Sequence, residues 1–341
     1  IMKLLPYPIA GHGEESEILF KGEDVLQKSK SQMRKLRGKK ISMIFQEPMT
    51  SLNPFLKCGD QIKESIFDSS SKLDIKNKVM ELLEEVEFED PKKIFNSYPH
   101  QISGGQRQRV MIAMAIANEP ELLIADEPTT ALDVSTEQSL LVLLKKIQKK
   151  MGMSIIFISH DLNIVRKISD RVLVMQKGKI KEENSMSEIF QNPKDPYTQR
   201  LINSSPKPKL GTINLNDEIL KISSMNLTYL KKDFIGRTSN FLALKNINFS
   251  IQRNSTLGLV GESGSGKSSL ARSILGIEKI SGEIFFNKKN ILNYNNQEKK
   301  HFKKNCQLVF QDPYSSLSPR QKIFDIVKEG LDIHEPSLTF L

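Results

Sequence analysis

The sequence contains only two cysteines, Cys58 and Cys306, among its 341 residues. Two distant thiols exclude a disulfide framework and a metal site built from four thiolates, and they are typical of a reducing compartment. We expect both to be buried or incidental thiols. The chain also lacks any stretch near the ~18 consecutive apolar residues that a membrane-spanning helix needs. Any role at a membrane is therefore expected to depend on a partner protein.

Long runs of one charge are missing too, although 50 Lys and Arg outnumber 40 Asp and Glu and give a formal net charge of +10. Such an excess is compatible with nucleic acid, an anionic lipid surface or a lysine-rich solvated surface. Because basic and acidic residues are interleaved along the chain, we favour the solvated surface. The length predicts about two globular domains.

An internal repeat organises the sequence. Residues 44–54 read IFQEPMTSLNP and residues 309–319 read VFQDPYSSLSP, so that Gln46 corresponds to Gln311 at an offset of 265 residues. An offset this long is typical of a duplicated domain and not of a solenoid.

The two copies overlap only partly, because the motifs found in one are not all found in the other. We expect residues 1–180 to hold a first copy that lacks its beginning, and residues 218–341 to hold the N-terminal part of a second copy. Residues 181–217 are rich in Pro, Asn, Ser and Lys. This composition predicts a linker of extended or loop backbone.

Short apolar runs alternate with helical patterns in the first copy. Residues 122–125 and 155–158 are continuous apolar runs, as expected of buried parallel strands. Residues 106–118 and 135–150 have helical patterns. The alternation predicts an α/β fold with a parallel sheet that is covered on both faces.

A phosphate-binding pattern, Gly-x-x-x-x-Gly-Lys-Ser, occupies residues 261–268. We expect an apolar strand at 257–260 before it and a helix at 268–275 after it. Glycines let backbone N–H groups approach a phosphate, and the helix adds its positive N-terminal end. Lys267 would reach the β- and γ-phosphates of a nucleotide, and Ser268 would offer its hydroxyl to Mg²⁺. The alternative, a flexible Gly and Ser turn, is disfavoured by the flanking strand and helix. The candidate nucleotide-binding residues of the loop are Gly261, Glu262, Ser263, Gly264, Ser265, Gly266, Lys267, Ser268 and Ser269.

Acidic residues follow the first apolar run, at the edge where open α/β sheets bind ligands. Asp126 suits coordination of Mg²⁺, directly or through water, and Glu127 suits polarising a water for in-line attack on a γ-phosphate. His160 follows the second apolar run in the same way. Acids and histidines after strands also serve as helix caps, so that these residues taken alone leave both roles open.

A second candidate anion site precedes the helical pattern at 106–118. Ser103 is a good N-cap, and Gly104 and Gly105 would expose backbone donors at the start of the helix. A plain capped helix explains these residues equally well.

Together, these motifs resemble those of the ATP-binding-cassette (ABC) ATPases in identity and order. The matching segments are the Q-loop glutamine Gln46, the signature Ser103–Gln106, the Walker B strand 122–127, the D-loop 131–133, the switch histidine His160, the Walker A loop 261–268 and a second Q-loop glutamine, Gln311. The resemblance implies a P-loop NTPase fold with a RecA-like parallel sheet and a helical subdomain, in two partial copies.

The resemblance also implies ATP and Mg²⁺ as cofactors and two cassettes that pair head-to-tail. Each site would combine the Walker A loop of one cassette with the signature residues Ser103, Gly104, Gly105 and Gln106, or their counterparts, from the other. Gln46 and Gln311 would sense the γ-phosphate and help to bind Mg²⁺, and Glu127 and His160 would act in hydrolysis. Tyr229 is the candidate for stacking on adenine, although an aromatic residue in a strand is as often part of the core.

Two further segments, 46–54 and NPKDPYT at 192–198, are similar to ATP-binding subunits of oligopeptide and dipeptide importers. The two copies look closest to fused peptide and microcin C importer ATPases, with Asp195 standing where that motif usually has His. The resemblance implies a peripheral ATPase on the cytoplasmic face of the inner membrane. It would work with integral permeases and a solute-binding protein, and it would bind neither the peptide itself nor nucleic acid.

Two other functions are alternatives to that of an importer ATPase. A soluble twin-cassette ATPase acting on ribosomes or DNA is supported only by the basic charge. A kinase-like transferase is disfavoured by the signature and the switch histidine. Since neither copy holds both a Walker A loop and a catalytic Glu, we expect the 341-residue chain alone to hydrolyse little ATP.

Overall fold

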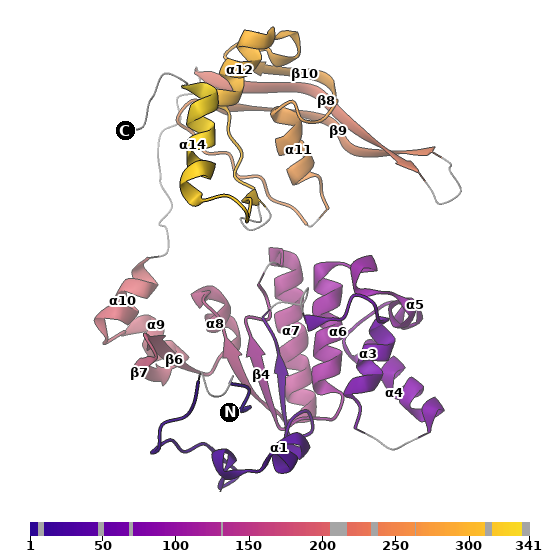
Figure 1. The fold of residues 1–341 in the computed structure, drawn as a ribbon, viewed down its shortest axis with the longest axis vertical. Coiled ribbons are helices and arrows are strands. Elements are labelled where there is room, and N and C mark those ends of the chain that lie inside the picture. The colour runs from indigo at the N-terminus through magenta and orange to yellow at the C-terminus, as the bar shows by residue number, and fades with distance from the viewer. Residues whose placement is uncertain are drawn as a thin grey trace. The chain divides into compact units, whose positions relative to one another are not determined.

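The structure is a computed structural model that describes residues 1–5, 10–46, 51–67, 71–130, 132–204, 217–232, 238–262, 264–310 and 316–335 (Figure 1). The chain divides into two compact units, Ile1–Lys207 and Pro208–Leu341. Each unit has its own hydrophobic core.

A three-stranded parallel sheet forms the centre of the first unit. Its strands are β3 (Ile41–Ile44), β4 (Leu122–Asp126) and β5 (Ser154–Ile158), in the order β3-β4-β5. The register pairs Ile41 with Leu122 and Leu122 with Ser154, so that the carboxyl ends of all three strands meet at one edge. The predicted parallel sheet is therefore confirmed.

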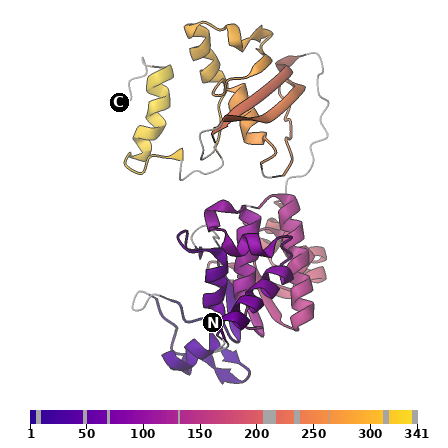
Figure 2. The same cartoon turned by 90° about the vertical axis from the view of Figure 1, so that its right-hand side faces the viewer.

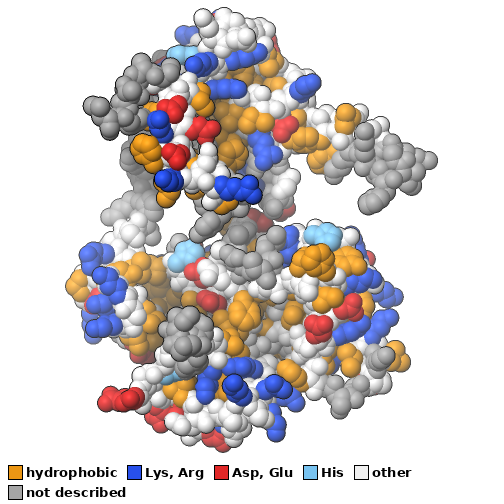
Figure 3. All heavy atoms as spheres, in the orientation of Figure 1, with side chains coloured by type: hydrophobic (Ala, Val, Ile, Leu, Met, Phe, Trp, Pro, Cys, Tyr) orange, Lys and Arg blue, Asp and Glu red, His pale blue; other side chains and the backbone are white. Residues whose placement is uncertain are grey.

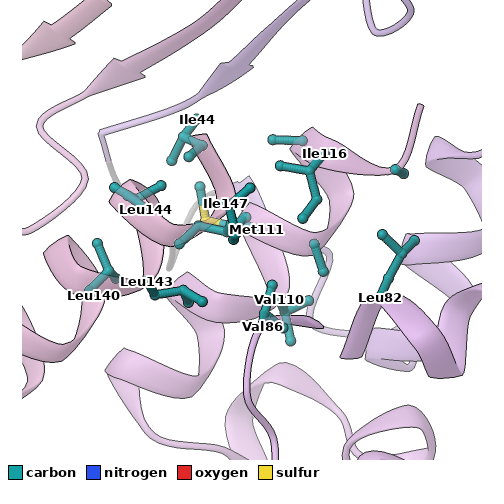
Figure 4. Close-up of a cluster of buried hydrophobic side chains, with 14 of the residues drawn as sticks. Ile44, Leu82, Val86, Val110, Met111, Ile116, Leu140, Leu143, Leu144 and Ile147 are labelled. Atoms are coloured by element: carbon teal, nitrogen blue, oxygen red, sulfur yellow. The ribbon is translucent and has the colours of Figure 1, made fainter. Parts of the chain in front are cut away.

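Two long helices pack beside this sheet (Figure 2). They are α6 (Gly104–Ile116) and α7 (Val134–Met151). α7 covers the pattern predicted at 135–150, and α6 matches the pattern predicted at 106–118 except for its last two residues. Apolar side chains at helical spacing face the core (Figure 4), where Leu143, Leu144 and Ile147 are completely buried. Each such side chain contributes on the order of 1.5–3 kcal/mol by leaving water.

The run at 155–158 does form a strand, but the prediction that it is fully buried is wrong. Ile155 and Phe157 pack against the core, whereas Ile156 and Ile158 are 39% and 44% exposed. β5 lies at the edge of the sheet, and among the described residues one of its faces stays open to solvent. An apolar run indicates a strand but does not say how many of its sides are covered.

Three further helices form a helical layer next to α6: α3 (Cys58–Ser65), α4 (Lys72–Glu85) and α5 (Pro91–Asn96). The Glu87 carboxylate, just after α4, joins this layer to the core by accepting hydrogen bonds from Arg109 at 3.5 Å and Lys146 at 2.7 Å. Arg109 also donates to the carbonyl oxygen of Val86 at 2.7 Å. The contacts fix the layer against both α6 and α7.

One group of elements occurs in both units, as the sequence repeat predicts. In the first unit it comprises β1 (Leu19–Phe20), β2 (Glu23–Asp24), the 3₁₀ turn η1 (Val25–Gln27) and α1 (Lys30–Leu36). In the second it comprises β10 (Ser281–Phe286), β11 (Lys289–Asn290), η3 (Ile291–Asn293) and α12 (Asn296–Asn305). Both helices begin with a capping box, which pairs Ser29 with Gln32 and Asn295 with Glu298.

The first part of the expected linker has regular structure, and the prediction of extended or loop backbone is wrong for its two helices, α9 (Met186–Gln191) and α10 (Pro196–Asn203). It holds for residues 181–185, which belong to the strand β7 (Lys179–Ser185). These elements pack together with α8 (Leu162–Ile168) and β6 (Arg171–Gln176), which precede them in the chain. They surround a small core that includes Ile189, which is fully buried. The Glu182 carboxylate accepts the backbone N–H groups of Lys194 and Asp195 at 2.9 and 3.0 Å. Pro193 lies between α9 and α10, and Pro196 is the first residue of α10, where proline is tolerated. Composition alone therefore indicated a loop.

The second unit is built on an antiparallel sheet in the order β11-β10-β8-β9. Its long strands are β8 (Glu218–Lys232) and β9 (Thr238–Gln252), and α11 (Lys267–Ile274) and α14 (Ile323–His334) are its further helices. The core includes Ile284, Met225 and Leu270.

The strand expected at 257–260 is absent, which corrects the prediction. These residues have no strand pairing, and Leu257, Leu259 and Val260 are 49%, 50% and 92% exposed. A parallel strand exists only by pairing with a neighbour, and no described strand pairs with this segment.

Among the described helices, none has the length and apolar character that crossing a bilayer requires.

Candidate functional site

Three side chains that the sequence analysis selected meet at the carboxyl ends of the parallel strands. Glu127 directly follows β4, Gln46 follows β3, and His160 follows β5. The Gln46 amide nitrogen donates to Glu127 Oε2 at 3.1 Å, and His160 Nδ1 lies 3.0 Å from Glu127 Oε1. The parallel register brings the three together, although they are far apart in the sequence.

The backbone at Glu127 is held in an unusual conformation. Its φ of 45° lies in the left-handed region, which non-glycine residues rarely adopt. Its N–H donates to the carbonyl oxygen of Ile158 at 3.0 Å, which ties the end of β4 to β5. The turn therefore fixes the direction in which the carboxylate leaves the sheet.

The Glu127 carboxylate also accepts a hydrogen bond from Thr130 Oγ1, at 2.9 Å. The sequence analysis did not select Thr130. The available signal was a hydroxyl three residues after a candidate base. The turn between the two residues is closed by a hydrogen bond of 3.2 Å from the Thr130 N–H to the Glu127 carbonyl oxygen. A carboxylate has about four acceptor positions, and three are used here. One remains for a water molecule.

These donors hold the pKa of Glu127 below its ordinary value, with the hydrogen bond from His160 as the largest cause. Partial burial acts in the opposite direction, and Thr130 and Gln46 add to the lowering. The Glu127 side chain is 20% exposed and that of His160 is 74% exposed. The carboxylate is therefore ionised at neutral pH and accessible from solvent.

His160 contacts this carboxylate, whereas Asp161 takes the role of N-cap of α8. Asp126 ends β4 and is half-buried.

The signature residues form the start of α6. The Ser103 hydroxyl accepts the N–H of Gln106 at 3.2 Å, and the Gln106 side chain accepts the N–H of Ser103 at 3.0 Å. Gly105 lies so close to α7 that a Cβ there would be 2.4 Å from Thr136 Cγ2. At Gly104 the nearest atom would be Leu132 Cδ2 at 3.9 Å. Gly105 therefore has a packing role, besides the predicted role of exposing a backbone donor at the start of the helix.

Asp133, from the D-loop, is the N-cap of α7. Its carboxylate accepts the N–H and hydroxyl groups of both Ser135 and Thr136. These bonds hold the pKa of Asp133 far below its usual range, with the N–H of Thr136 as the largest cause.

The phosphate-binding pattern leads into α11, whose N-cap is Gly266. The ammonium group of Lys267 donates to the carbonyl oxygens of Gly261 and Glu262, both at 2.7 Å, and lies 3.3 Å from Ser265 Oγ. The positive charge of Lys267 is therefore held over the loop.

The glycines of this loop meet the demands of a phosphate cradle. Gly264 and Gly266 have φ values of 82° and 97°, which favour glycine. A Cβ at Gly266 would lie 2.9 Å from Leu244 Cδ2 and 3.2 Å from the carbonyl oxygen of Ala243. The loop, the cation and the following helix fit a bound nucleotide phosphate with its Mg²⁺. Ser268, the candidate for Mg²⁺, is exposed in the first turn of α11.

Tyr229 lies on β8 and is half-buried against the core of the second unit. Its hydroxyl is 3.4 Å from Ser269 Oγ, in α11. This position next to the phosphate loop is compatible with the core role that the sequence analysis left open. Ser263 and Gln311, both predicted to bind nucleotide, lie outside the described residues, as does Ala131 of the D-loop.

The fold and the grouping of Gln46, Glu127 and His160 are those of an ABC-type P-loop ATPase core. The sequence model described as "ABC transporter" matches residues 5–130 and 244–335. The chain belongs to the ABC transporter family.

Curated relatives are longer than this chain. It is 42% identical to the peptidoglycan transport ATP-binding protein YejF of Agrobacterium fabrum, over 99% of this chain and 63% of the relative. It is 41% identical to the uncharacterized ABC transporter ATP-binding protein YejF of Escherichia coli K12, over 99% of this chain and 65% of that protein. The glutathione import ATP-binding protein GsiA of Escherichia coli O6:H1 is 39% identical, with 91% of this chain and 55% of GsiA covered. The chain thus spans less than two thirds of the relatives it matches.

Among solved structures, the dimeric ATP-binding cassette MJ0796 bound to ADP and Pi is 29% identical, with a TM-score of 0.46. The match covers 51% of this chain and 74% of MJ0796.

Proposed function

We propose that the protein is the ATP-binding and ATP-hydrolysing subunit of an ABC importer for peptides. The observation that carries the proposal is the Glu127 carboxylate, held between Gln46, Thr130 and His160 at the carboxyl ends of three parallel strands. The names of two relatives, for peptidoglycan transport and glutathione import, support a role in transport.

In the proposed mechanism, the fixed carboxylate of Glu127 uses its remaining acceptor position to orient a water molecule and take up its proton. The contact with His160 keeps Glu127 ionised and fixes one ring nitrogen, Nδ1, so that the other nitrogen is left to contact phosphate oxygen. Gln46 keeps Glu127 and the Q-loop in one hydrogen-bonded group.

Nucleotide binding falls to the loop that ends in Lys267. Its backbone N–H groups, the ammonium group of Lys267 and the hydroxyl of Ser268 would hold the phosphates and Mg²⁺, which supplies charge neutralisation during phosphoryl transfer. As the sequence analysis predicts, the signature at Ser103–Gln106 would act on the nucleotide of a paired cassette. Permease subunits, a solute-binding protein and a position at the inner face of the membrane complete the proposal.

Substitution of Glu127 tests the catalytic part. In the protein assembled with its permeases, Glu127→Gln should slow ATP hydrolysis by two orders of magnitude or more and leave ATP binding intact, because the amide cannot take up a proton. Phosphate release and the binding of a fluorescent ATP analogue are measured in parallel. Glu121→Gln is the matched control, since Glu121 lies at the opposite end of β4 and pairs with Lys21 and Lys40. Undiminished turnover in Glu127→Gln would remove Glu127 as the base.

Co-purification tests the transport part. The protein should be recovered from membranes together with two permease subunits and should be absent from ribosomal pellets. Recovery with ribosomes instead would favour the soluble twin-cassette alternative.

A further inference from the structure

The net positive charge of the chain is concentrated in two corresponding stretches, one in each unit, which include the helices α1 and α12. Residues 21–40 hold eight Lys or Arg against two Asp or Glu, and residues 287–305 hold six against one. Their net charges of +6 and +5 together exceed the +10 of the whole chain. The remaining residues are close to neutral, so the charge is not spread evenly over the surface.

About half of these basic residues lie on two helices, α1 and α12. The α1 patch consists of Lys30, Arg34 and Lys35, and all three side chains are exposed. On the same helix, Met33 is 2% exposed and faces the interior. One face of α1 is therefore apolar and buried, and the other is basic and solvated.

The α12 patch repeats this arrangement with Lys299, Lys300 and Lys303. Phe302 is 5% exposed and packs into the core of the second unit. Figure 3 shows Lys and Arg side chains gathered over both helices.

Part of the surrounding charge is already paired. Lys28 pairs with Glu23, and Lys289 pairs with Glu298. By contrast, none of the six patch side chains has an ion-pair partner among the residues that the structure describes. Charges left without a partner in both copies are available to an external anion.

A shallow cavity of about 260 Å³ adjoins the α1 patch. Its lining residues are Lys28, Gln32, Lys35, Leu36 and Lys40. Lys28 and Lys40 are paired with Glu23 and Glu121, so that Lys35 is the lysine at this cavity whose charge is left for an external phosphate.

We propose that the α1 and α12 patches bind the phosphate headgroups of anionic lipids. The choice of lipid rests on the proposed membrane-associated function. Lysines act as flexible point charges, which suits mobile headgroups better than base edges. The phenyl ring of Phe302 in α12 packs into the core, so it is not available for stacking on a base.

Exposed leucines also favour a lipid surface. Leu19, 58% exposed, lies in the hairpin that leads to α1, and Leu292, 49% exposed, lies in the turn that leads to α12. An apolar side chain beside basic residues is the pattern of an interfacial membrane contact. Each basic residue near an anionic surface strengthens binding about fivefold.

Vesicle co-sedimentation tests the proposal with the purified protein, in the absence of permeases and ATP. Binding to vesicles with 30% phosphatidylglycerol is compared with binding to pure phosphatidylcholine. We expect binding only to the anionic vesicles, with a steep loss between 50 and 300 mM salt. Lys30→Glu/Arg34→Glu/Lys35→Glu and Lys299→Glu/Lys300→Glu/Lys303→Glu should each weaken it at least tenfold.

The control variant is Lys92→Glu/Lys145→Glu/Lys149→Glu, which reverses three exposed lysines outside the patches and should leave binding unchanged. Circular dichroism verifies folding, and the same patch positions changed to Gln give a milder second series. Equal loss in the control variant, or no loss in either patch variant, would overturn the proposal.

Two competitors separate the sources of phosphate. Tighter binding to a 30-nucleotide RNA than to anionic vesicles at the same salt would overturn the choice of lipid, as would complete displacement from vesicles by millimolar inorganic phosphate. ATP turnover is measured separately, on the protein assembled with its permeases. Turnover there without vesicle binding by the purified protein would contradict only this proposal, and vesicle binding without turnover in the assembled protein would contradict only the proposed function.

Discussion

At the scale of single residues, the candidate site depends on the surroundings of one carboxylate. Glu127 has a left-handed backbone conformation, which costs on the order of 1–3 kcal/mol in a non-glycine residue. Its backbone N–H bond to Ile158 and the three donors around its carboxylate offset this cost. A strained residue that so many neighbours hold in place is typical of a functional position.

The hydrogen-bond donors around Glu127 predict how strongly the loss of each donor raises the pKa of Glu127. His160→Ala should raise the pKa of Glu127 most, Thr130→Val less, and Gln46→Ala least, because the three hydrogen bonds lower that pKa in this order. Carbon-13 NMR titration of labelled glutamate carboxyls measures the three shifts. The Glu121 carboxyl, lowered by Lys21 and Lys40, serves as an internal control that should not move.

The same shift has a consequence for stability. Since the pKa of Glu127 in the folded protein lies below the ordinary value of 4.5, folding favours the ionised form. This contribution is complete above about pH 4.5 and is lost as the pH falls through the folded pKa. If Gln46→Ala raised the pKa of Glu127 more than His160→Ala does, the hydrogen-bond geometry around this carboxylate would be contradicted.

Sequence reasoning reached this site because each residue type has a chemical reason to follow a strand. Gln46, Glu127 and His160 were all selected in this way. Thr130 was not, because a threonine three residues after an acid is common, and only the turn geometry gives it a partner.

At the scale of elements, the contact between α6 and α7 explains one residue of the signature. The Cβ that Gly105 lacks would lie 2.4 Å from Thr136 Cγ2. Thr136 cannot rotate away cheaply, because its hydroxyl donates to Asp133 Oδ2 at 2.8 Å and β-branched side chains are restricted at χ1. The packing of two helices therefore depends on the absence of one methyl group.

Gly105→Ala should destabilise the first unit by about 1–3 kcal/mol through overpacking. Gly104→Ala, with its nearest neighbour at 3.9 Å, should be close to neutral. Urea unfolding measures both variants.

A second substitution identifies the cause. Thr136→Ser removes the clashing methyl group and keeps the hydroxyl that bonds Asp133. It should restore most of the stability that Gly105→Ala loses. An additive loss in the double variant would show that the clash is not the source of the effect.

The elements were predicted best where local pattern and tertiary packing agree. α6, α7 and the parallel sheet follow the apolar periodicity closely. The segment 257–260 has strand composition but no described partner strand, and a strand cannot form without one. In residues 181–204, Pro193 lies between two short helices and Pro196 begins the second, a pattern that composition could not distinguish from a loop.

At the scale of the whole molecule, the repeat and the packing describe the same division. Elements from β1 to α1 recur from β10 to α12, and each set belongs to a unit with its own core. The offset of 265 residues predicted a duplicated domain. The boundaries assigned to the two cassettes, 1–180 and 218–341, remain a prediction, since α9 and α10 pack within the first unit.

Two separate cores predict separate responses to core truncation. Leu143→Ala should remove about 2–5 kcal/mol from the first unit, and Ile284→Ala a similar amount from the second, because both side chains are completely buried. In scanning calorimetry of the 341-residue chain, each substitution should lower one transition and leave the other in place. The expectation follows from cooperativity, which extends as far as side chains share one packed core. If both substitutions lowered one common transition equally, the chain would unfold as a single cooperative body, and the division into two units would have no thermodynamic meaning.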